Sequence, residues 1–511
     1  MQTRRTQALA VRDEAARLAS LRPHGRPLAN GDESRYRIGT DLAYFGNFTK
    51  GLAHDALGHV NPPAYRALLR AVASGDPADF EKIPLAGNRK LVNPQAGLAF
   101  DLQGPDTGSL TIPPAPAIDS AEEASEMAEL YWMALARDVP FRNYNGADPT
   151  ISTAVNNLNT FSDFRGPKVA GVVTTDSLFR GITSGDLTGP YISQFMWLPV
   201  TFGTLTIPQF NLTATPGVDY MQDFATWLNV QNGFSQPPDT FDSFRRYIRN
   251  LRDLATYVHF DALYEAYLNA CLILLQIKAP FDDGNPYRDS ANQDGFGTFG
   301  GPHILSLVCE VATRALKSVW RQKWMVHRRL RPEAFAGLVH NQAKGAFNYN
   351  GALHPEILRT DAASVLTAVN TFNVSKGHDT FLLPMAFPEG SPIHPAYGAG
   401  HATVAGACTT ILKAWFDESW AIPSPVQAAA DGLTLDPWVG APLTVGGELN
   451  KVCANISTGR NAGGVHWRTD YTESIRLGEE LAIGILEEQK LCFNERLTFS
   501  LTKFDGTTIR I

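Results

Sequence analysis

Charged residues are scarce in this chain. Asp, Glu, Lys and Arg make up 19% of its 511 residues, where about 25% is usual. Acidic residues outnumber basic ones by 51 to 44, and the resulting net charge of -7 argues against a general nucleic-acid binder. The hydrophobic content of 44% argues against disorder. This composition suits a large buried body, or one that buries surface between subunits.

Cysteine is also scarce, and long apolar runs are missing. The five cysteines are an odd number scattered between positions 271 and 492, which excludes a secreted-type disulfide framework. The longest apolar stretch, 262–275, is broken by Glu265 and is shorter than the roughly 20 residues that span a bilayer. Charges interrupt residues 1–20, so no signal peptide is apparent. We expect a soluble, cytoplasmic protein with no membrane partner.

Helical patterns dominate the chain. Asp119 and Ser120 followed by Glu122 predict a capped helix that runs to about residue 139. Further helices are expected at 242–277, 303–330, 359–372, 401–417 and 470–488. Hairpins are expected within 201–213 and at Asp505-Gly506, and loops at 104–118, 232–240, 281–302 and 421–447. The pattern predicts a mainly α fold, one large helical domain over 1–511 built as two four-helix bundles with minor β-hairpins.

The first motif that carries chemistry is WRQKWMVHRRLRP, 320–332. On a helix Lys323, His327 and Arg331 are four residues apart, so their side chains point to one side. Pro332 disfavours helical geometry at Arg331, so the helix is expected to end there. Taken alone, a basic helix is more often a solvated face.

The second motif is SPIHPAYGAGHATVAGACTTILKAWF, 391–416. Prolines and glycines predict an irregular loop as far as Gly400, followed by a buried helix. The unpaired N–H groups and the positive dipole at the start of that helix favour an oxyanion. His401 lies beside it, where a proton donor or acceptor is useful. A lone Gly-His before a helix is more often an ordinary cap.

The third motif is GRNAGGVHWRTDY, 459–471. Arg460 precedes His466 by six residues across a glycine-rich turn. Asp470 follows His466 by four, so on a helix its carboxylate could orient the imidazole. A structural arginine and a satisfied histidine near a turn are an equally good interpretation of this segment alone.

Together the three motifs are far more specific than any one of them. Lys-x7-Arg-Pro, then Gly-His at a helix start, then Arg-x5-His-x3-Asp resembles the signature of vanadium-dependent haloperoxidases and the related acid phosphatases. The strings HRRLRPEAF, HPAYGAGHAT and GVHWR resemble the bromoperoxidase branch of red algae and cyanobacteria. So do NFTKGLAHDALG (47–58), LVNPQAGLAFDLQGPD (91–106) and FGTFGGPHIL (296–305). The resemblance therefore spans nearly the whole chain.

The resemblance implies a role for each motif residue. The groups that hold the oxygens of vanadate are Lys323, Arg331, Arg460 and the backbone N–H of Gly400. His466 bonds the vanadium, His401 is the acid-base group, and Lys323 also polarises the peroxide. His394 stands where brominating relatives have histidine, which implies bromide preference.

Two positions depart from the family pattern. Ala399 replaces the usual serine, so a hydroxyl bond to the oxyanion is missing. A neutral hydrogen bond is worth only about 0.5 to 1.5 kcal/mol, so we expect weaker vanadate retention or altered peroxide handling, and no loss of function. Gln322 replaces a residue that is charged in algal relatives, which leaves halide selectivity open. Trp320 is expected in the core more than along the halide approach.

The loop 281–295, FDDGNPYRDSANQDG, is rich in oxygen ligands, and algal relatives bind calcium in this neighbourhood. Its spacing is not that of an EF-hand, which favours a hydrated acidic loop. The remaining histidines, among them His54, His59, His259 and His303, are expected in the core or at the surface, with His327 as a neighbour of the site.

The function implied is oxidation of bromide and iodide by hydrogen peroxide to hypohalous acid, which halogenates small organic nucleophiles. Residues 1–300 would serve mainly as scaffold and oligomer contacts, and residues 301–490 would carry the vanadate site in a homo-oligomer. Two alternatives stay open: a phosphatase with His466 as nucleophile, and a non-catalytic oxyanion binder.

Overall fold

The computed structural model describes residues 3–146 and 148–511, which form fifteen α-helices and four two-stranded antiparallel hairpins. The helices are α1 (Arg4–Leu21), α2 (Asp32–Arg35), α3 (Pro62–Ser74), α4 (Pro77–Phe80), α5 (Ala121–Leu135), α6 (Pro149–Leu158), α7 (Phe224–Gln231), α8 (Leu251–Phe260), α9 (Glu265–Gln276), α10 (Gly301–Arg321), α11 (Pro332–Ala343), α12 (Val365–Ser375), α13 (Gly400–Lys413), α14 (Val445–Ala462) and α15 (Arg468–Lys490). The hairpins pair β1 (Arg37–Ile38) with β2 (Asp41–Leu42), β3 (Val200–Phe202) with β4 (Leu205–Ile207), β5 (Val426–Ala428) with β6 (Leu435–Pro437), and β7 (Ser500–Thr502) with β8 (Thr508–Arg510). The mainly α prediction is confirmed.

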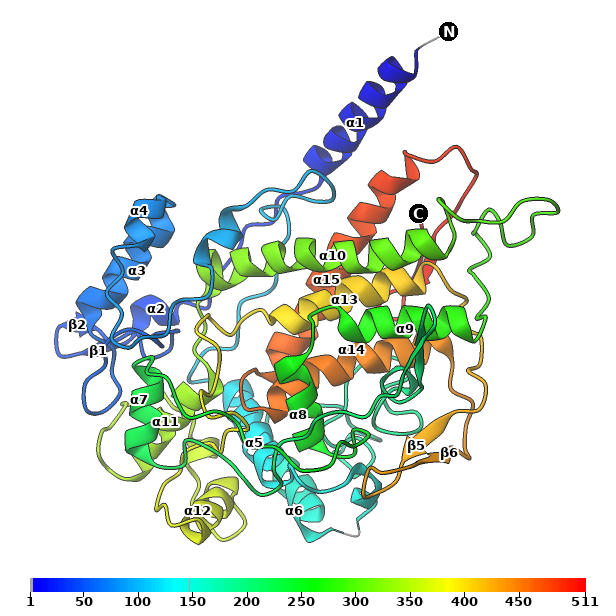
Figure 1. Cartoon of the computed structure of the whole chain (residues 1–511). Coiled ribbons are helices and arrows are strands. Elements are labelled where there is room, and N and C mark those ends of the chain that lie inside the picture. Colours follow the sequence, from blue (N-terminus) through cyan, green and yellow to red (C-terminus); the bar gives the residue numbers. More distant parts are fainter. Residues whose placement is uncertain (1–2, 147) are drawn as a thin grey trace.

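Four long helices, α10, α13, α14 and α15, form the central bundle, with α13 packed against the other three (Figure 1). Glycines bring the backbones of α13 and α15 close together. A Cβ added at Gly406 would lie 2.1 Å from the carbonyl oxygen of Ile475, and one at Gly478 would lie 2.0 Å from that of Thr403. Because a larger residue cannot fit at either position, the register of the two helices is fixed. That register places the start of α13 beside the start of α15.

A second group of helices surrounds α5, which contacts α6, α11 and α12 (Figure 1). The predicted cap of α5 is confirmed, because the Ser120 side chain accepts a hydrogen bond from the backbone N–H of Glu123. Although α5 carries the acidic residues Glu123, Glu126 and Glu129, all three are buried. Buried carboxylates need cationic partners, and α5 therefore supports the basic motifs of the C-terminal half.

The helical region predicted over 242–277 is helical from residue 251 but is not continuous. The chain forms α8 and α9 there, with a bend of 100° between them. Neither glycine nor proline causes the break. In the turn between the helices, the Glu265 side chain accepts a hydrogen bond from the backbone N–H of Ala262, and Asp261 lies 3.0 Å from His401. In the described part of the chain no single helix is long and apolar enough to cross a membrane; only the bent pair α8 and α9 reaches that length and composition together.

Both predicted hairpins are confirmed, as β3–β4 and as β7–β8, where Gly506 has a φ of +86°. The segment 421–447, predicted as a loop, contains the hairpin β5–β6 and the start of α14. The sequence of α14 opens with two glycines and is rich in Asn, Ser and Thr, which are weak helix formers. Burial of nearly every residue of α14 compensates for that weak propensity. The five cysteines form no disulfide.

Candidate active site

The three motifs meet at a cavity of about 340 Å³, at the end of the central bundle where α13 begins. Its walls come from the α8–α9 turn, α10, the loop before α13, α14 and the α14–α15 turn. The cavity is lined by His259, Leu263, Leu316, Trp320, Glu389, Gly390, Pro392, His394, Gly400, His401, Arg460 and His466. Lys323 and Arg331 are joined to this wall by short contacts with the 394–396 segment and with His466. Every residue predicted for the site is therefore in or against one cavity.

Three buried cations bond only to neutral acceptors. Lys323 Nζ donates to the carbonyl oxygens of Pro395 and Ala396 at 2.7 and 2.9 Å. Arg331 donates to the carbonyl oxygens of His394 and Val465 at 2.9 and 2.6 Å. Arg460 Nη1 donates to the carbonyl of Val258, and its Nε is buried with no hydrogen-bond partner. No carboxylate of the described residues lies within 4.0 Å of any of these cations.

Burial lowers the pKa values of all three cations. Burial, and then the neighbouring Arg331, lowers the pKa of Lys323 well below its usual value. Burial likewise lowers the pKa of Arg331 to about 9 and that of Arg460 to about 10. A buried charge without a partner is expensive. The arrangement therefore favours an anion with several oxygen acceptors.

The prediction that Lys323, His327 and Arg331 share one helix face is wrong. α10 ends at Arg321 and continues as one π-helical turn, Gln322–His327, after which Arg328 adopts a left-handed conformation with φ 45°. Arg331 is the extended cap before α11, with ψ 153°, as Pro332 requires. The chain thus reverses between the two cations, and they approach the cavity from different elements. His327 packs against Tyr397 and does not line the cavity.

Gly400 is the first residue of α13, as predicted. A Cβ at this position would lie 3.1 Å from the ring of Trp320, so the indole leaves little room for a side chain. The first N–H groups of a helix have no partner within the helix. At Gly400 such a group lies in the cavity wall beside Arg460 and His466.

His466 is held by Asp470. Its Nδ1–H donates to Asp470 Oδ2 at 2.7 Å, so Nε2 carries the lone pair and accepts from Arg331 Nη1 at 3.0 Å. Asp470 is held in turn by the backbone N–H of Trp467 and by Arg329, which also pairs with Glu126 of α5. Burial lowers the pKa of His466 well below its usual value. The imidazole is therefore neutral, which is the form that binds metals.

Two further histidines line the cavity at different depths. The side chain of His401 is 20% exposed, and its Nε2 lies 3.0 Å from a carboxylate oxygen of Asp261, in the α8–α9 turn. His394 is buried, with Nδ1 2.9 Å from Arg331 Nη2 and its ring 4.9 Å from that of Trp320. Burial, reinforced by Lys323 and Arg331, lowers the pKa of His394 well below its usual value. His394 is thus a neutral hydrogen-bonding group.

Two residues of the cavity differ from their expected roles. Trp320 lines the cavity, half-buried, so the expectation of a core tryptophan is wrong. His259, expected to be an ordinary core or surface residue, lies at the cavity and stacks on Phe387 with ring centres 3.9 Å apart. Its Nε2 lies 3.3 Å from Glu389 and 3.8 Å from Asp239. No sequence signal joins His259 to Phe387 and Glu389, because these neighbours in space are more than 100 residues away in the chain.

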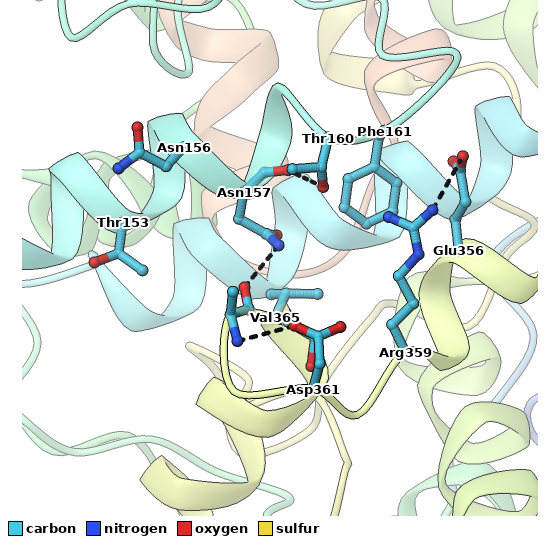
Figure 2. Close-up of a pocket in the computed structure, with 11 residues that line it drawn as sticks. Thr153, Asn156, Asn157, Thr160, Phe161, Glu356, Arg359, Asp361 and Val365 are labelled. Atoms are coloured by element: carbon cyan, nitrogen blue, oxygen red, sulfur yellow. Dashed lines mark hydrogen bonds and ion pairs between the residues drawn. The ribbon is translucent and has the colours of Figure 1, made fainter.

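Another cavity, of about 370 Å³, lies between α6 and the segment that leads into α12 (Figure 2). Figure 2 shows that its polar side chains bond within the protein: Asn157 donates to the carbonyl of Ala363, and Arg359 pairs with Glu356. Arg359 is the single cation among the described residues that line it. Because its charge is already balanced, this cavity lacks the feature that favours an anion.

Comparisons with known proteins agree with this geometry. The family model described as the VCPO second helical-bundle domain matches residues 314–495. The chain is 40% identical over 597 aligned positions to the vanadium-dependent bromoperoxidase of Corallina officinalis, covering 100% of this chain and 99% of the relative. The chain belongs to the vanadium-dependent bromoperoxidase family. A second relative, from Ascophyllum nodosum, is 38% identical over 92% of this chain and 87% of its own length.

The fold agrees as well as the sequence with this bromoperoxidase family. The homohexameric structure of the second vanadate-dependent bromoperoxidase, AnII, from Ascophyllum nodosum matches with a TM-score of 0.94 and 32% identity. The match covers 100% of this chain and 91% of AnII. The helices that carry the cavity are therefore shared with AnII, and the predicted family is confirmed.

The two positions that depart from the bromoperoxidase pattern lie in different surroundings. Ala399 is the cap residue of α13 and makes no side-chain hydrogen bond there, while its backbone N–H donates to Ser474 Oγ at 2.8 Å. Gln322 is buried and donates to the carbonyl of Leu110. Gln322 does not line the cavity, so only Ala399 adjoins the groups that face it.

The acidic loop 281–295 bonds to the protein through its carboxylates. Asp282 accepts from Ser500 and from the backbone N–H of Gly284, and Asp283 pairs with Arg288. Among the described residues, the one group of three His, Cys, Asp or Glu ligand atoms within 4.8 Å of one another is Asp239, His259 and Glu389, outside this loop.

Proposed function

We propose that this protein is a vanadate-dependent haloperoxidase, which oxidises bromide and iodide with hydrogen peroxide. The overall reaction combines peroxide, halide and one proton into hypohalous acid and water, and the hypohalous acid then halogenates small organic nucleophiles. The observation that carries the proposal is the set of three buried cations around a neutral imidazole, with no carboxylate of the described residues within 4.0 Å of any of the three cations.

The residues of the cavity suit vanadate. Lys323, Arg331 and Arg460 would bind its oxygens, because guanidinium and ammonium groups form the strongest hydrogen bonds to oxyanions. The orphaned Nε of Arg460 is a donor that an anion would satisfy. The backbone N–H of Gly400 adds a neutral donor, and His466 would ligate vanadium through Nε2, since Asp470 holds Nδ1.

Vanadate, when bound, supplies a Lewis acid that makes hydrogen peroxide electrophilic. His401 takes a proton from the peroxide at Nδ1, because Asp261 holds Nε2. Lys323 Nζ polarises the peroxide by hydrogen bonding. Halide then attacks one peroxide oxygen, and the protein returns a proton to the oxygen that leaves.

Bromide specificity is assigned to His394. Its neutral ring is bonded at Nδ1 by Arg331 and lies 4.9 Å from the ring of Trp320, so a cationic group and an aromatic ring both adjoin it. A position that is partly apolar and partly cationic favours halides that are large and weakly hydrated over halides that are small and strongly hydrated. We therefore expect bromide and iodide to be the halides oxidised.

The decisive experiment compares bromination by the vanadate-free protein with and without added orthovanadate, beside hydrolysis of a phosphate ester by the vanadate-free protein. We expect bromination that requires vanadate. Vigorous hydrolysis with no vanadate-dependent bromination would instead favour the phosphatase alternative, in which His466 attacks phosphorus.

A second experiment separates catalysis from anion binding. H401A should abolish turnover while vanadate stays bound, because His401 is assigned to proton transfer and not to the oxyanion oxygens. Unchanged turnover in H401A would remove that role.

Further features of the proposal concern the whole chain. We place the vanadate site in residues 301–490 and assign residues 1–300 mainly to scaffold and oligomer contacts, in a homo-oligomer as AnII is. Calcium binding near 281–295 is the less favoured of two interpretations, since Asp282 and Asp283 already have protein partners. The cytoplasmic location stays a prediction.

A further inference from the structure

A buried ion pair outside the cavity joins the N-terminal part of the chain to the loop that carries His394. Lys50 and Glu333 are 2% and 1% exposed, and Lys50 Nζ lies 2.5 Å from Glu333 Oε1. The same ammonium donates to the carbonyl oxygens of Glu389 and Ser391 at 2.8 and 2.6 Å. All three donors of the ammonium are thus used, two of them on the loop backbone.

Glu333 binds the same loop from the other side. Its Oε2 accepts hydrogen bonds from the backbone N–H of Ser391 at 2.7 Å and from the Ser391 hydroxyl. Glu333 lies in the first turn of α11, two residues after Arg331. The carboxylate is therefore tied rigidly to the segment that also presents the Arg331 guanidinium.

The far end of the loop is held by Arg331 itself, which donates through Nε to the carbonyl of His394 and through Nη2 to its ring. Between the two ends, the carbonyl of Ile393 accepts from the backbone N–H of Val92. Gly51, with φ +90°, lies against the Ile393 side chain, which a Cβ would approach to 3.2 Å. Residues 50, 51 and 92 belong to two of the sequence strings, 47–58 and 91–106, that the vanadate cavity does not contain.

We propose that Lys50 and Glu333 are positioning residues for His394: they fix the loop 389–394 so that the imidazole lies between Arg331 and Trp320, and thereby set the affinity for bromide. The inference rests on the proposed function for its kinetic readout only. A buried ion pair seldom adds stability over a well-packed apolar pair. Lys50 and Glu333 form hydrogen bonds to the backbone of residues 389 and 391, which an apolar pair cannot form.

The test compares K50M with K451M in the vanadate-loaded holoenzyme. Met keeps the length of the lysine stem and removes the ammonium. Lys451 is a matched control, because it forms an equally buried 2.5 Å pair with Glu448 on α14 and makes no contact with the loop 389–394. Steady-state bromination at saturating peroxide gives the KM for bromide and kcat separately, and crystal structures of both variants give the position of His394.

We expect K50M to raise the KM for bromide by roughly tenfold, since a shift of about 1 Å in a positioned group has large kinetic effects. The dissociation constant for vanadate should change much less, and the His394 ring should be displaced. K451M should lower the melting temperature without changing the KM for bromide. Equal effects of K50M and K451M on this KM, or an undisplaced His394 in K50M, would overturn the proposal.

A milder variant covers the case in which K50M does not fold. S391A removes one hydroxyl bond to Glu333 and leaves the ion pair intact, so it should shift the KM for bromide in the same direction by a smaller factor; an unchanged KM together with an unmoved His394 counts against the proposal. If the wild-type protein shows no vanadate-dependent bromination, the proposed function fails. The crystallographic comparison of His394 still decides the positioning role in that case.

Discussion

The replacement D470N tests whether Asp470 prepares His466 for metal ligation. The carboxylate is fully buried and serves three donors: Oδ2 accepts from His466 Nδ1 at 2.7 Å and from the Trp467 backbone at 3.1 Å, and Oδ1 accepts from Arg329 at 2.9 Å. Asparagine has nearly the same shape but only one oxygen. In either orientation its NH2 group must face a donor.

The size of the effect follows from that mismatch. A buried donor left without an acceptor costs about 1 to 3 kcal/mol. Loss of a partner that orients a metal-binding histidine typically weakens metal affinity by about 10- to 100-fold, which corresponds to roughly 1.4 to 2.8 kcal/mol. The two estimates overlap. We therefore expect the dissociation constant for vanadate to rise by about 10- to 100-fold in D470N.

Equilibrium dialysis of the vanadate-free protein against orthovanadate, with vanadium analysis of both compartments, measures this constant directly. E129Q is the matched control, because Glu129 is equally buried, pairs with Arg468 of α15 and makes no contact with His466. If D470N binds vanadate as tightly as E129Q does, Asp470 only supports the fold and the reasoning fails.

Three further predictions concern the anion cavity. Orthovanadate at about 100 times its dissociation constant should raise the free energy of unfolding by about 2.7 kcal/mol; an unchanged melting temperature would mean that the folded state binds no vanadate. In the vanadate-free protein, burial lowers the pKa of Lys323 below its ordinary 10.5, so the folded state binds fewer protons than the unfolded chain and stability rises with pH toward that value. Denaturant titrations at several alkaline pH values should show that K323M flattens this slope, and an equal slope in both proteins would contradict the assignment. A399S should tighten vanadate binding by about twofold to tenfold if the restored hydroxyl reaches the anion, whereas higher stability at constant affinity would show that the serine only caps α13.

The local geometry of two motifs could be predicted from their own residues, whereas the convergence of all three followed from the family resemblance. Pro332 forces Arg331 out of the helix, and Gly400 opens α13, as their conformational preferences require. The pairing of His466 with Asp470 was also predicted, on the expectation that both lie on one helix. In the structure His466 precedes α15 and Asp470 lies in its first turn.

Other parts of the site depend on contacts that the local sequence does not contain. The π-helical turn after α10 cannot be distinguished from an α-helix by residue spacing. Asp261 reaches His401 only because a helix expected to continue bends by 100°. α14, which carries Arg460, was predicted only as a loop and turn because tertiary burial outweighs its weak helix propensity.

The bend between α8 and α9 has a consequence for how this enzyme family could diversify. The family model begins at residue 314, so all the residues proposed to bind the oxyanion are encoded downstream of that point, while His259 and Asp261, the partner of His401, are encoded upstream. A lineage could therefore change His259 and Asp261 by mutations in the upstream part of its gene. The proposed oxyanion-binding residues, encoded in the downstream part, would be inherited unchanged. Among such descendants, differences in the acid-base behaviour of His401 and in substrate access to the cavity should then arise from substitutions in the turn between α8 and α9.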